Sequence, residues 1–480
     1  MRTRTLRVLM CPYCAAPLEP EARRPESGDE IESAILRCEC SEFPLLGGVP
    51  IFRRDGRVDT MKQTVHSVIH RGPDVRLLVE RIREGDPDRA LLMLLVPPDR
   101  RVRNTRRAAE VLPGRAGRPV MRRAYRAWDR LAERHRSLFL DDASASQSRS
   151  TAEDLLAYYG ADWFVHWDFF LHRFGMPRHL TSLGLASILP TSDKPVLDVA
   201  CGMGHTLHYW TTRHPGHLFV GLDRNFFQLY AARRWVAPGA DYVCSDADVS
   251  LPFRSDAFGG AFCMDAFHLF RARLTCASEM ERVTGDDGVV EIVRAGNVLV
   301  KPREGLELTP AAYFRLFGDR EARLVPENEL LERYLGGLGP ALQRHVDPAE
   351  VAADKWISFV ISKRRDVFRD YGPFGEWPHG LGRLAINPLY QETRRGASGE
   401  VELELVFPTE WYEVENAECR RYMPASVNAS AADLEDVAAG RRTPRVEEWI
   451  RSSVVVGVPE RYLRTTGPRP STHRATAAAG

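Results

Sequence analysis

Short hydrophobic runs alternate with amphipathic stretches between residues 195 and 300, and this alternation predicts parallel strands joined by helices. The first four runs end at Val199, Asp223, Cys244 and Met264. Buried parallel strands are almost continuously apolar because helices cover both faces of their sheet. The pattern therefore predicts an α/β domain built on a doubly wound sheet.

A glycine-containing turn follows the first strand, in the stretch PVLDVACGMGHTLHYW that begins at Pro195. Gly202 and Gly204 can adopt backbone conformations that other residues avoid, and they let the backbone approach a ligand closely. The helix after the turn offers unpaired amides at its N-terminus, which favour an anionic or polar ligand. A tight strand-to-helix connection needs glycine in any α/β protein, so the turn alone leaves both interpretations open.

Acidic and polar residues stand at the ends of the next strands. Asp223 ends the second strand about twenty residues after the turn, where an acid accepts hydrogen bonds from ribose hydroxyls in doubly wound folds. Asp246 follows the third strand, and Asp265 and His268 follow the fourth. Ligands of such folds bind at the carboxyl ends of the strands, so these side chains are predicted to line one site.

Four segments, DVACGMG, GLDRN, SDADVSLPF and CMDAFHLF, resemble in order and spacing the successive motifs of class I S-adenosylmethionine-dependent methyltransferases of the type 11 kind. The resemblance covers about Thr151 to Lys363 and implies a Rossmann-like seven-stranded sheet. Ala200 stands where many members have glycine, and Gly259 and Gly260 replace a frequent aspartate. A nicotinamide-binding domain usually shows G-x-G-x-x-G, whereas this chain has C-G-M-G-H-T.

The resemblance implies a role for each strand end. The Asp198 carboxylate would hold the methionine end of the cofactor, Asp223 would accept from the ribose hydroxyls, and Asp246 would read the adenine edge. Each aspartate could instead cap a turn or helix, and capping is the favoured interpretation for Asp248. The implied cofactor-binding set is Asp198, Ala200, Cys201, Gly202, Gly204, Asp223, Arg224, Asp246, Ala247 and Asp265.

His268 and Asp265 are the catalytic candidates, because they follow the fourth strand on the expected acceptor side. A hydroxyl, thiol or acidic carbon acceptor needs a general base, for which His268 is best placed, while Asp265 would orient it or hold the acceptor. A structural histidine bonded within its loop is an equal alternative. The aromatic stretch before the first strand should pack mostly as core, and it also supplies lid candidates: Tyr158, Tyr159, Trp163 and His166.

Four cysteines near the N-terminus form two close pairs, Cys11 with Cys14 and Cys38 with Cys40. Two thiol pairs separated by a loop have the spacing of a zinc ribbon, in which each pair gives two thiolates to a tetrahedral ion. The second pair is C-x-C, so a water or another ligand could replace Cys40; free thiols or a disulfide are the alternative. EFPLLGGVPIF after this pair resembles the ending of Trm112-like zinc-binding domains, which are often fused to methyltransferases.

Composition and charge narrow the function classes. The 480 residues exceed what a single hydrophobic core normally holds. The chain has 66 basic and 65 acidic side chains, and this balance argues against a nucleic-acid binder as a whole. No apolar run approaches the roughly 18 residues of a membrane span, and the N-terminus shows no signal-peptide cleavage site. We therefore expect a cytoplasmic protein.

The expected function is methyl transfer from S-adenosylmethionine to a small-molecule or carrier-bound metabolite, with zinc as a structural metal. One alternative is an RNA base methyltransferase that uses the ribbon and an Arg-rich segment as a clamp, and another is a non-catalytic scaffold. The acceptor and the oligomeric state stay open. The expected segments are a zinc ribbon at 1–57, a helical Arg-rich segment at 58–140, a linker at 141–150, the methyltransferase domain at 151–365, a mixed α+β appendage at 366–465 and a disordered tail at 466–480.

Overall fold

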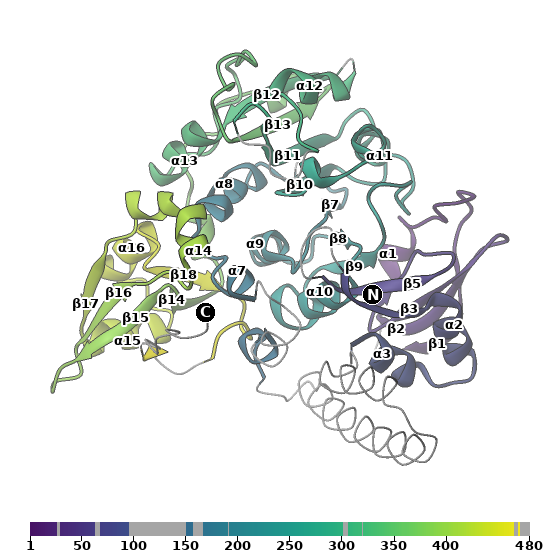
Figure 1. Cartoon of the computed structure of the whole chain (residues 1–480), viewed down its shortest axis with the longest axis horizontal. Helices are drawn as coiled ribbons and strands as arrows, with labels where there is room; N and C mark the ends of the chain where they lie inside the picture. The colour runs from purple at the N-terminus through teal and green to yellow at the C-terminus, as the bar shows by residue number, and fades with distance from the viewer. Residues whose placement is uncertain are drawn as a thin grey trace, which may run out of the picture.

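The fold consists of a central α/β domain flanked by an N-terminal module and a C-terminal appendage (Figure 1). The computed structural model describes residues 1–25, 29–62, 68–95, 150–156, 167–190, 192–300, 306–318, 320–464 and 469–470. Residues 96–149, which hold most of the predicted Arg-rich segment and linker, lie outside the described residues. So do most of the predicted tail and the four lid candidates, Tyr158, Tyr159, Trp163 and His166.

The central domain is built on a seven-stranded sheet of order β12-β13-β11-β10-β7-β8-β9. Strands β11, β10, β7, β8 and β9 pair in parallel, and β13 runs antiparallel to both β11 and β12. The predicted doubly wound, Rossmann-like sheet is confirmed. The strands are β7 Val196–Val199, β8 Phe219–Asp223, β9 Asp241–Cys244, β10 Gly260–Met264, β11 Val289–Gly296, β12 Glu321–Pro326 and β13 Trp356–Ser362.

Alternate residues of these strands enter two different hydrophobic cores, one on each face of the sheet. Leu197 and Val220 belong to one core, while Phe219 and Phe262 belong to the other. On this second face the Trp210 ring stacks on Phe219 with centroids 5.7 Å apart. The helices of this domain are α7 Trp167–Leu171, α8 Pro177–Ala186, α9 His205–Arg213, α10 Phe226–Ala231, α11 Arg273–Thr284, α12 Pro310–Phe314 and α13 Glu327–Leu335.

The N-terminal module contains a four-stranded sheet of order β1-β2-β3-β4 and a second hairpin. The segment from residue 58, predicted to be helical, begins instead with this hairpin, because β-branched residues such as Val58 and Thr60 favour extended backbone. The helices predicted after it are present as α2 and α3. The elements are α1 Thr3–Leu6, β1 Glu19–Pro25, β2 Ile31–Arg37, β3 Glu42–Leu46, β4 Val49–Pro50, β5 Arg57–Lys62, β6 Val68–Asp74, α2 Val75–Arg83 and α3 Pro87–Leu95.

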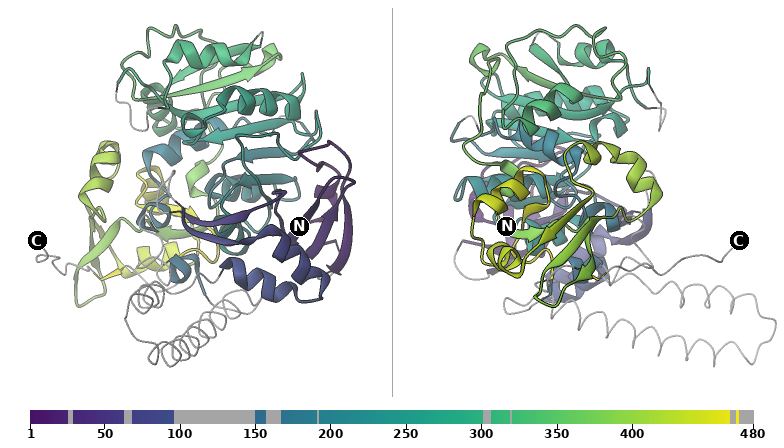
Figure 2. Two further views of the ribbon diagram at one scale, coloured as in Figure 1. Left: turned by 45° about the vertical axis from the view of Figure 1, so that its right-hand side comes forward. Right: turned by 90° about the vertical axis from the view of Figure 1, so that its left-hand side faces the viewer.

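The N-terminal module covers the β9 edge of the central sheet (Figures 1 and 2). The Phe52 amide donates to the Cys244 carbonyl of β9 at 2.8 Å. The buried Arg233 guanidinium pairs with Glu30 at 3.1 Å and with Glu32 at 3.2 Å. An uncovered edge strand presents open hydrogen-bonding groups that template aggregation, so this docking protects the sheet as well as holding the module.

The C-terminal appendage packs beside α7 and α8, on the side of the domain away from the N-terminal module (Figure 1). The Ser430 hydroxyl and the Asp433 carboxylate form a reciprocal capping box at the start of one of its helices, Ala431–Ala438. Within the described residues, no helix combines the length and the apolar character needed to cross a membrane. The elements are β14 Arg383–Ile386, β15 Tyr390–Arg395, β16 Val401–Leu405, α14 Glu410–Glu415, β17 Ser426–Ala429, α15 Ala431–Ala438, α16 Pro444–Arg451, β18 Val455–Val458 and β19 Arg469–Pro470.

Candidate functional site

The turn between β7 and α9 has left-handed backbone at three positions. Ala200, Gly202 and Gly204 have φ values of 60°, 54° and 75°. At Gly204 a Cβ atom would lie 3.0 Å from the Tyr242 hydroxyl, so the site needs glycine for space as well as for conformation. Ala200 has no such freedom and costs about 1–2 kcal/mol in this conformation. The turn therefore holds a strained shape at the carboxyl end of β7.

Asp223 at the end of β8 stabilises this turn through hydrogen bonds to backbone amides. One carboxylate oxygen accepts from the Gly202 amide at 3.1 Å, and the other accepts from the Asn225 amide at 2.8 Å. The residue is only 7 % exposed. A carboxylate offers about four acceptor positions, so these two bonds leave capacity for ligand hydroxyls. Asp223 thus ties the ends of two neighbouring strands together, a role that sequence reasoning missed.

Asp198 of β7 is 3 % exposed and lies near Asp223. Burial first, and then the negative charge of Asp223, raise the pKa of the Asp198 carboxyl group well above its usual value, and the positive charge of Arg173 opposes this rise only in part. A buried carboxylate becomes stable as an anion when a cation is placed against it. The site can therefore accept an ammonium group beside Asp198.

The remaining predicted cofactor residues line the neighbouring strand ends. The Cys201 amide donates to the Leu222 carbonyl at 3.0 Å, which keeps the turn next to β8. Arg224 follows directly after β8, and Asp246 and the buried Ala247 follow β9. An Asp246 oxygen accepts from the Asp248 amide at 3.1 Å, which closes a local turn.

The Asp248 side chain forms its hydrogen bond outside the predicted cofactor site. Its carboxylate accepts from the Ala272 amide at 2.9 Å, immediately before α11. This bond satisfies an amide at the start of α11, whose N-cap residue is Ala272 and not Asp248.

On the acceptor side, Asp265 after β10 is surrounded by arginines. Its carboxylate lies 3.0 Å from Arg178, 3.8 Å from Arg173 and 3.9 Å from Arg294. Burial by itself raises the Asp265 pKa, but the nearby guanidinium groups outweigh it and lower this pKa to about 2. Asp265 is consequently an anion at any physiological pH.

His268 lies in a short 3₁₀ turn, Phe267–Leu269, directly after Asp265. It is 4 % exposed, and its ring centroid is 5.5 Å from that of Trp356. The ring also packs close to the backbone of Gly296 at the end of β11. The structure thus places His268 against the carboxyl end of the sheet, and its role as a base stays a prediction.

Sequence reasoning missed the arginines that surround Asp265. Arg173 precedes α8 and Arg178 lies within it, whereas Arg294 belongs to β11. Arg294 forms an ion pair with Glu327 and lies 4.7 Å from the Trp356 ring centroid. A charged residue inside the apolar run GVVEIVRAGN was the one available signal, because arginine in a buried strand requires partners.

Asp265 is expected to make the protein acid-sensitive. An unfolded aspartate titrates near 3.9 and folded Asp265 has a pKa of about 2, so its contribution of about 2 kcal/mol is present above pH 4 and is lost towards pH 2. Urea unfolding should show about 1 kcal/mol of this loss between pH 5 and pH 3. On acidification, the Asp265→Asn variant should lose less free energy of unfolding than wild type. The Asp287→Asn variant, which changes an exposed side chain, should lose as much as wild type. Equal acid losses in wild type and Asp265→Asn would refute the assignment.

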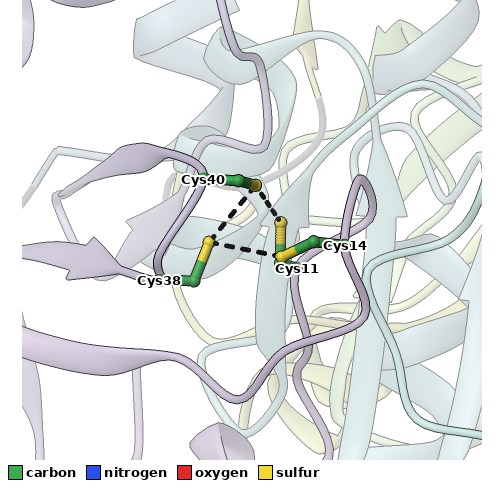
Figure 3. Close-up of side chains that lie close together, drawn as sticks. All are labelled: Cys11, Cys14, Cys38 and Cys40. Atoms are coloured by element: carbon green, nitrogen blue, oxygen red, sulfur yellow. Dashed lines mark hydrogen bonds between the residues drawn. The ribbon is translucent and has the colours of Figure 1, made fainter.

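The four N-terminal cysteines converge on one point (Figure 3). Their Sγ atoms all lie within 4.8 Å of one another, with separations of 3.6 Å for Cys11–Cys40 and Cys38–Cys40 and 3.8 Å for Cys14–Cys38. A tetrahedral zinc ion with bonds of about 2.3 Å requires sulfur separations of about 3.8 Å. The arrangement fits zinc, and Cys40 is as well placed as the other three.

Known proteins are similar to the central domain of this chain. Residues 197–292 match the family model described as methyltransferase domain. A phthiotriol/phenolphthiotriol dimycocerosates methyltransferase of Mycobacterium ulcerans is 33% identical over 117 residues, which are 24% of this chain and 39% of the relative. The Mycobacterium tuberculosis enzyme is 26% identical over 179 residues, which are 36% of this chain and 62% of the relative. The chain thus spans less than two thirds of either relative.

Solved structures give more distant matches. A complex of the Haloferax volcanii Trm112 methyltransferase activator with a methyltransferase is 16% identical, with a TM-score of 0.32, over 43% of this chain and 97% of the matched chain. A TehB-like methyltransferase of Corynebacterium glutamicum is 17% identical, with a TM-score of 0.29, over 38% of this chain and 88% of the matched chain. The residues that match the methyltransferase domain model, 197–292, thus lie in the Rossmann-like seven-stranded sheet and include the turn after β7.

Proposed function

We propose that this protein transfers a methyl group from S-adenosylmethionine to a small-molecule or carrier-bound acceptor. The observation that carries the proposal is the turn after β7, whose left-handed backbone is braced by Asp223 at the end of the neighbouring β8. Such a turn brings amide groups and a carboxylate to the carboxyl edge of the sheet, where ligands of doubly wound folds bind. The methyltransferase family match over the same residues supports this choice of cofactor.

Each strand end receives one part of the cofactor in this proposal. Asp198 faces the methionine ammonium group, which would relieve its unfavourable burial. Asp223 accepts from the ribose hydroxyls, and Asp246 accepts from the adenine amino group. The proposed cofactor-binding set is Asp198, Ala200, Cys201, Gly202, Gly204, Asp223, Arg224, Asp246, Ala247 and Asp265.

When bound, the cofactor supplies a methyl group on a positively charged sulfur. The chain contributes position, because an acceptor held in line with the bond that breaks reacts as part of one molecule. Asp265, fixed by its arginines, orients the acceptor side, and His268 accepts a proton from acceptors that must lose one.

The proposal also specifies the chemical class of the methyl acceptor. The two Mycobacterium relatives are named for phthiotriol and phenolphthiotriol dimycocerosates, and neither is named for RNA. The near-zero net charge of the whole chain also favours a metabolite over a polyanionic nucleic acid.

We also propose that the four-cysteine cluster binds a structural zinc ion in a Trm112-like module. The mutual distances of the Sγ atoms support the metal. The contacts of the module with Cys244 and Arg233 support a role in stabilising the β9 edge of the catalytic domain. A module of this size gains folding free energy from its metal.

Calorimetric titration of the full chain with S-adenosylmethionine and with S-adenosylhomocysteine tests the proposed cofactor, with NADH as the control. We expect a dissociation constant in the micromolar range, worth about 8 kcal/mol, for both sulfur compounds and no heat from NADH. Absence of binding to both sulfur compounds would contradict the enzyme and favour the non-catalytic scaffold. Binding of NADH instead would indicate a nicotinamide-dependent domain.

A further inference from the structure

Three buried arginines gather at the carboxyl ends of β10 and β11, on the side where the acceptor is proposed to bind. We call Arg173, Arg178 and Arg294 the arginine cluster. Their side chains are 10%, 7% and 5% exposed, and all three approach the Asp265 carboxylate. The backbones of Asp265 and Arg294 have positive φ values of 55° and 57°. Non-glycine residues held in this region are concentrated at functional sites.

The carboxylates near the arginine cluster are unequally distributed. Glu327 forms an ion pair with Arg294, and Glu415 of α14 lies 3.9 Å from Arg178. Neither is an ion-pair partner of Arg173, which pairs with the shared Asp265 at 3.8 Å and whose positive charge also acts on the buried Asp198 carboxyl group. In the described part of the chain, Arg173 is therefore the member whose one ion-pair carboxylate is shared with the other two arginines.

The hydrogen bonds of Arg173 are also few. A guanidinium group has five N–H donors. In the described residues Arg173 donates to the Met264 sulfur at 3.3 Å, which is a weak acceptor, and its guanidinium lies 4.9 Å from the Phe169 ring centroid. Burial lowers the Arg173 pKa to about 10, although Asp265 opposes this effect. A buried cation with so few acceptors is costly for the fold alone.

Arg178 and Arg294 also have buried donor atoms without a hydrogen-bond partner in the described residues. The Nε atom of Arg178 is buried without a hydrogen-bond partner, and so is the Nε atom of Arg294. Buried polar atoms in native proteins are normally satisfied, so these two Nε donors have the capacity for a further acceptor at this place. The guanidinium carbons of Arg173 and Arg178 also lie over the Phe169 ring, 4.9 Å and 4.8 Å from its centroid.

We propose that the arginine cluster binds an oxyanion, a carboxylate or a phosphate, carried by the methyl acceptor, with Arg173 as its main ligand. This inference rests on the proposed function, because the acceptor side is defined by the cofactor turn. The planar fork of arginine donates two parallel hydrogen bonds to either kind of oxyanion. The acceptor is therefore an acidic metabolite, or a metabolite attached to a phosphate-bearing carrier.

The test uses the full chain loaded with S-adenosylhomocysteine and two probes, inorganic phosphate and sodium acetate, each added at ionic strength held constant with sodium chloride. We expect at least one probe to raise the thermal midpoint by about 2–4 °C when it is in large excess over its dissociation constant. A response to phosphate alone would indicate a phosphate-bearing acceptor, and a response to acetate alone would indicate a carboxylate. No response beyond that of chloride would overturn the inference.

Substitutions of Arg173 distinguish a role in anion binding from a role in stabilising the fold. Arg173→Met should weaken probe binding at least tenfold and leave the midpoint without probe unchanged or higher, because it removes a poorly satisfied buried charge. Arg173→Lys keeps the charge, loses the fork and should retain weak binding. Arg213→Met removes an exposed guanidinium that pairs with Glu376 and should respond like wild type.

One outcome of this series counts against anion binding by the arginine cluster. A lower midpoint for both Arg173 variants with probe binding retained would assign Arg173 a purely structural role and overturn the inference. Repeating the probe titration without S-adenosylhomocysteine tests anion binding independently of the proposed methyltransferase function. A protein that fails to bind S-adenosylhomocysteine and still binds the probe would lose the proposed function and keep the anion site.

Discussion

Replacing Cys38 and Cys40 together with serine is expected to abolish zinc binding and to unfold the N-terminal module. Both sulfur atoms belong to the group that lies within 4.8 Å, and two remaining thiolates cannot complete a tetrahedral site. Structural zinc supplies on the order of 10 kcal/mol of folding free energy in small modules, more than a four-stranded sheet of this size supplies without metal. Metal analysis of the purified variant, combined with urea unfolding, measures both effects.

The same substitution should affect the central domain, because the module covers the β9 edge through the Phe52 bond to Cys244. We expect the zinc-free variant to aggregate at lower temperature than wild type, since an exposed edge strand pairs with other chains. Cys276→Ala removes a thiol that lies in the core and should leave the zinc content unchanged. Full zinc retention by the Cys38→Ser, Cys40→Ser variant would show that these two cysteines do not bind the metal.

The sheet could be predicted because its signal is local. Each buried strand is an apolar run in the sequence, and each acid at a strand end marks the edge where ligands bind. The cysteine pairs were equally visible, since their spacing is a property of the sequence.

The interactions that sequence reasoning missed are formed between distant parts of the chain. Arg173 and Asp265 are far apart in sequence, and only the packing of α8 against the sheet brings them together. The Asp223 brace on the turn likewise depends on the register of β7 and β8. At residue 58 the Arg-rich composition further along the chain suggested a helix, while the local β-branched residues formed a hairpin.

Asp223→Ala is expected to lower the affinity for S-adenosylmethionine by at least about 100-fold. The substitution removes two charge-assisted bonds to the Gly202 and Asn225 amides, which are worth about 1.5–3 kcal/mol each. It therefore removes the proposed ribose acceptor and loosens the turn that presents the backbone to the methionine end. Calorimetric titration with S-adenosylhomocysteine measures the affinity without interference from turnover.

Two control variants distinguish the charge of Asp223 from its shape. Asp223→Asn keeps one oxygen acceptor and the side-chain volume, so it should bind S-adenosylhomocysteine more tightly than Asp223→Ala and more weakly than wild type. Asp248→Ala removes an acid whose carboxylate bonds the Ala272 amide before α11 and should leave the affinity within about threefold of wild type. Equal affinities of Asp223→Ala and wild type would exclude Asp223 from the cofactor site, because an acid that contacts the ribose and holds the turn cannot be removed without cost.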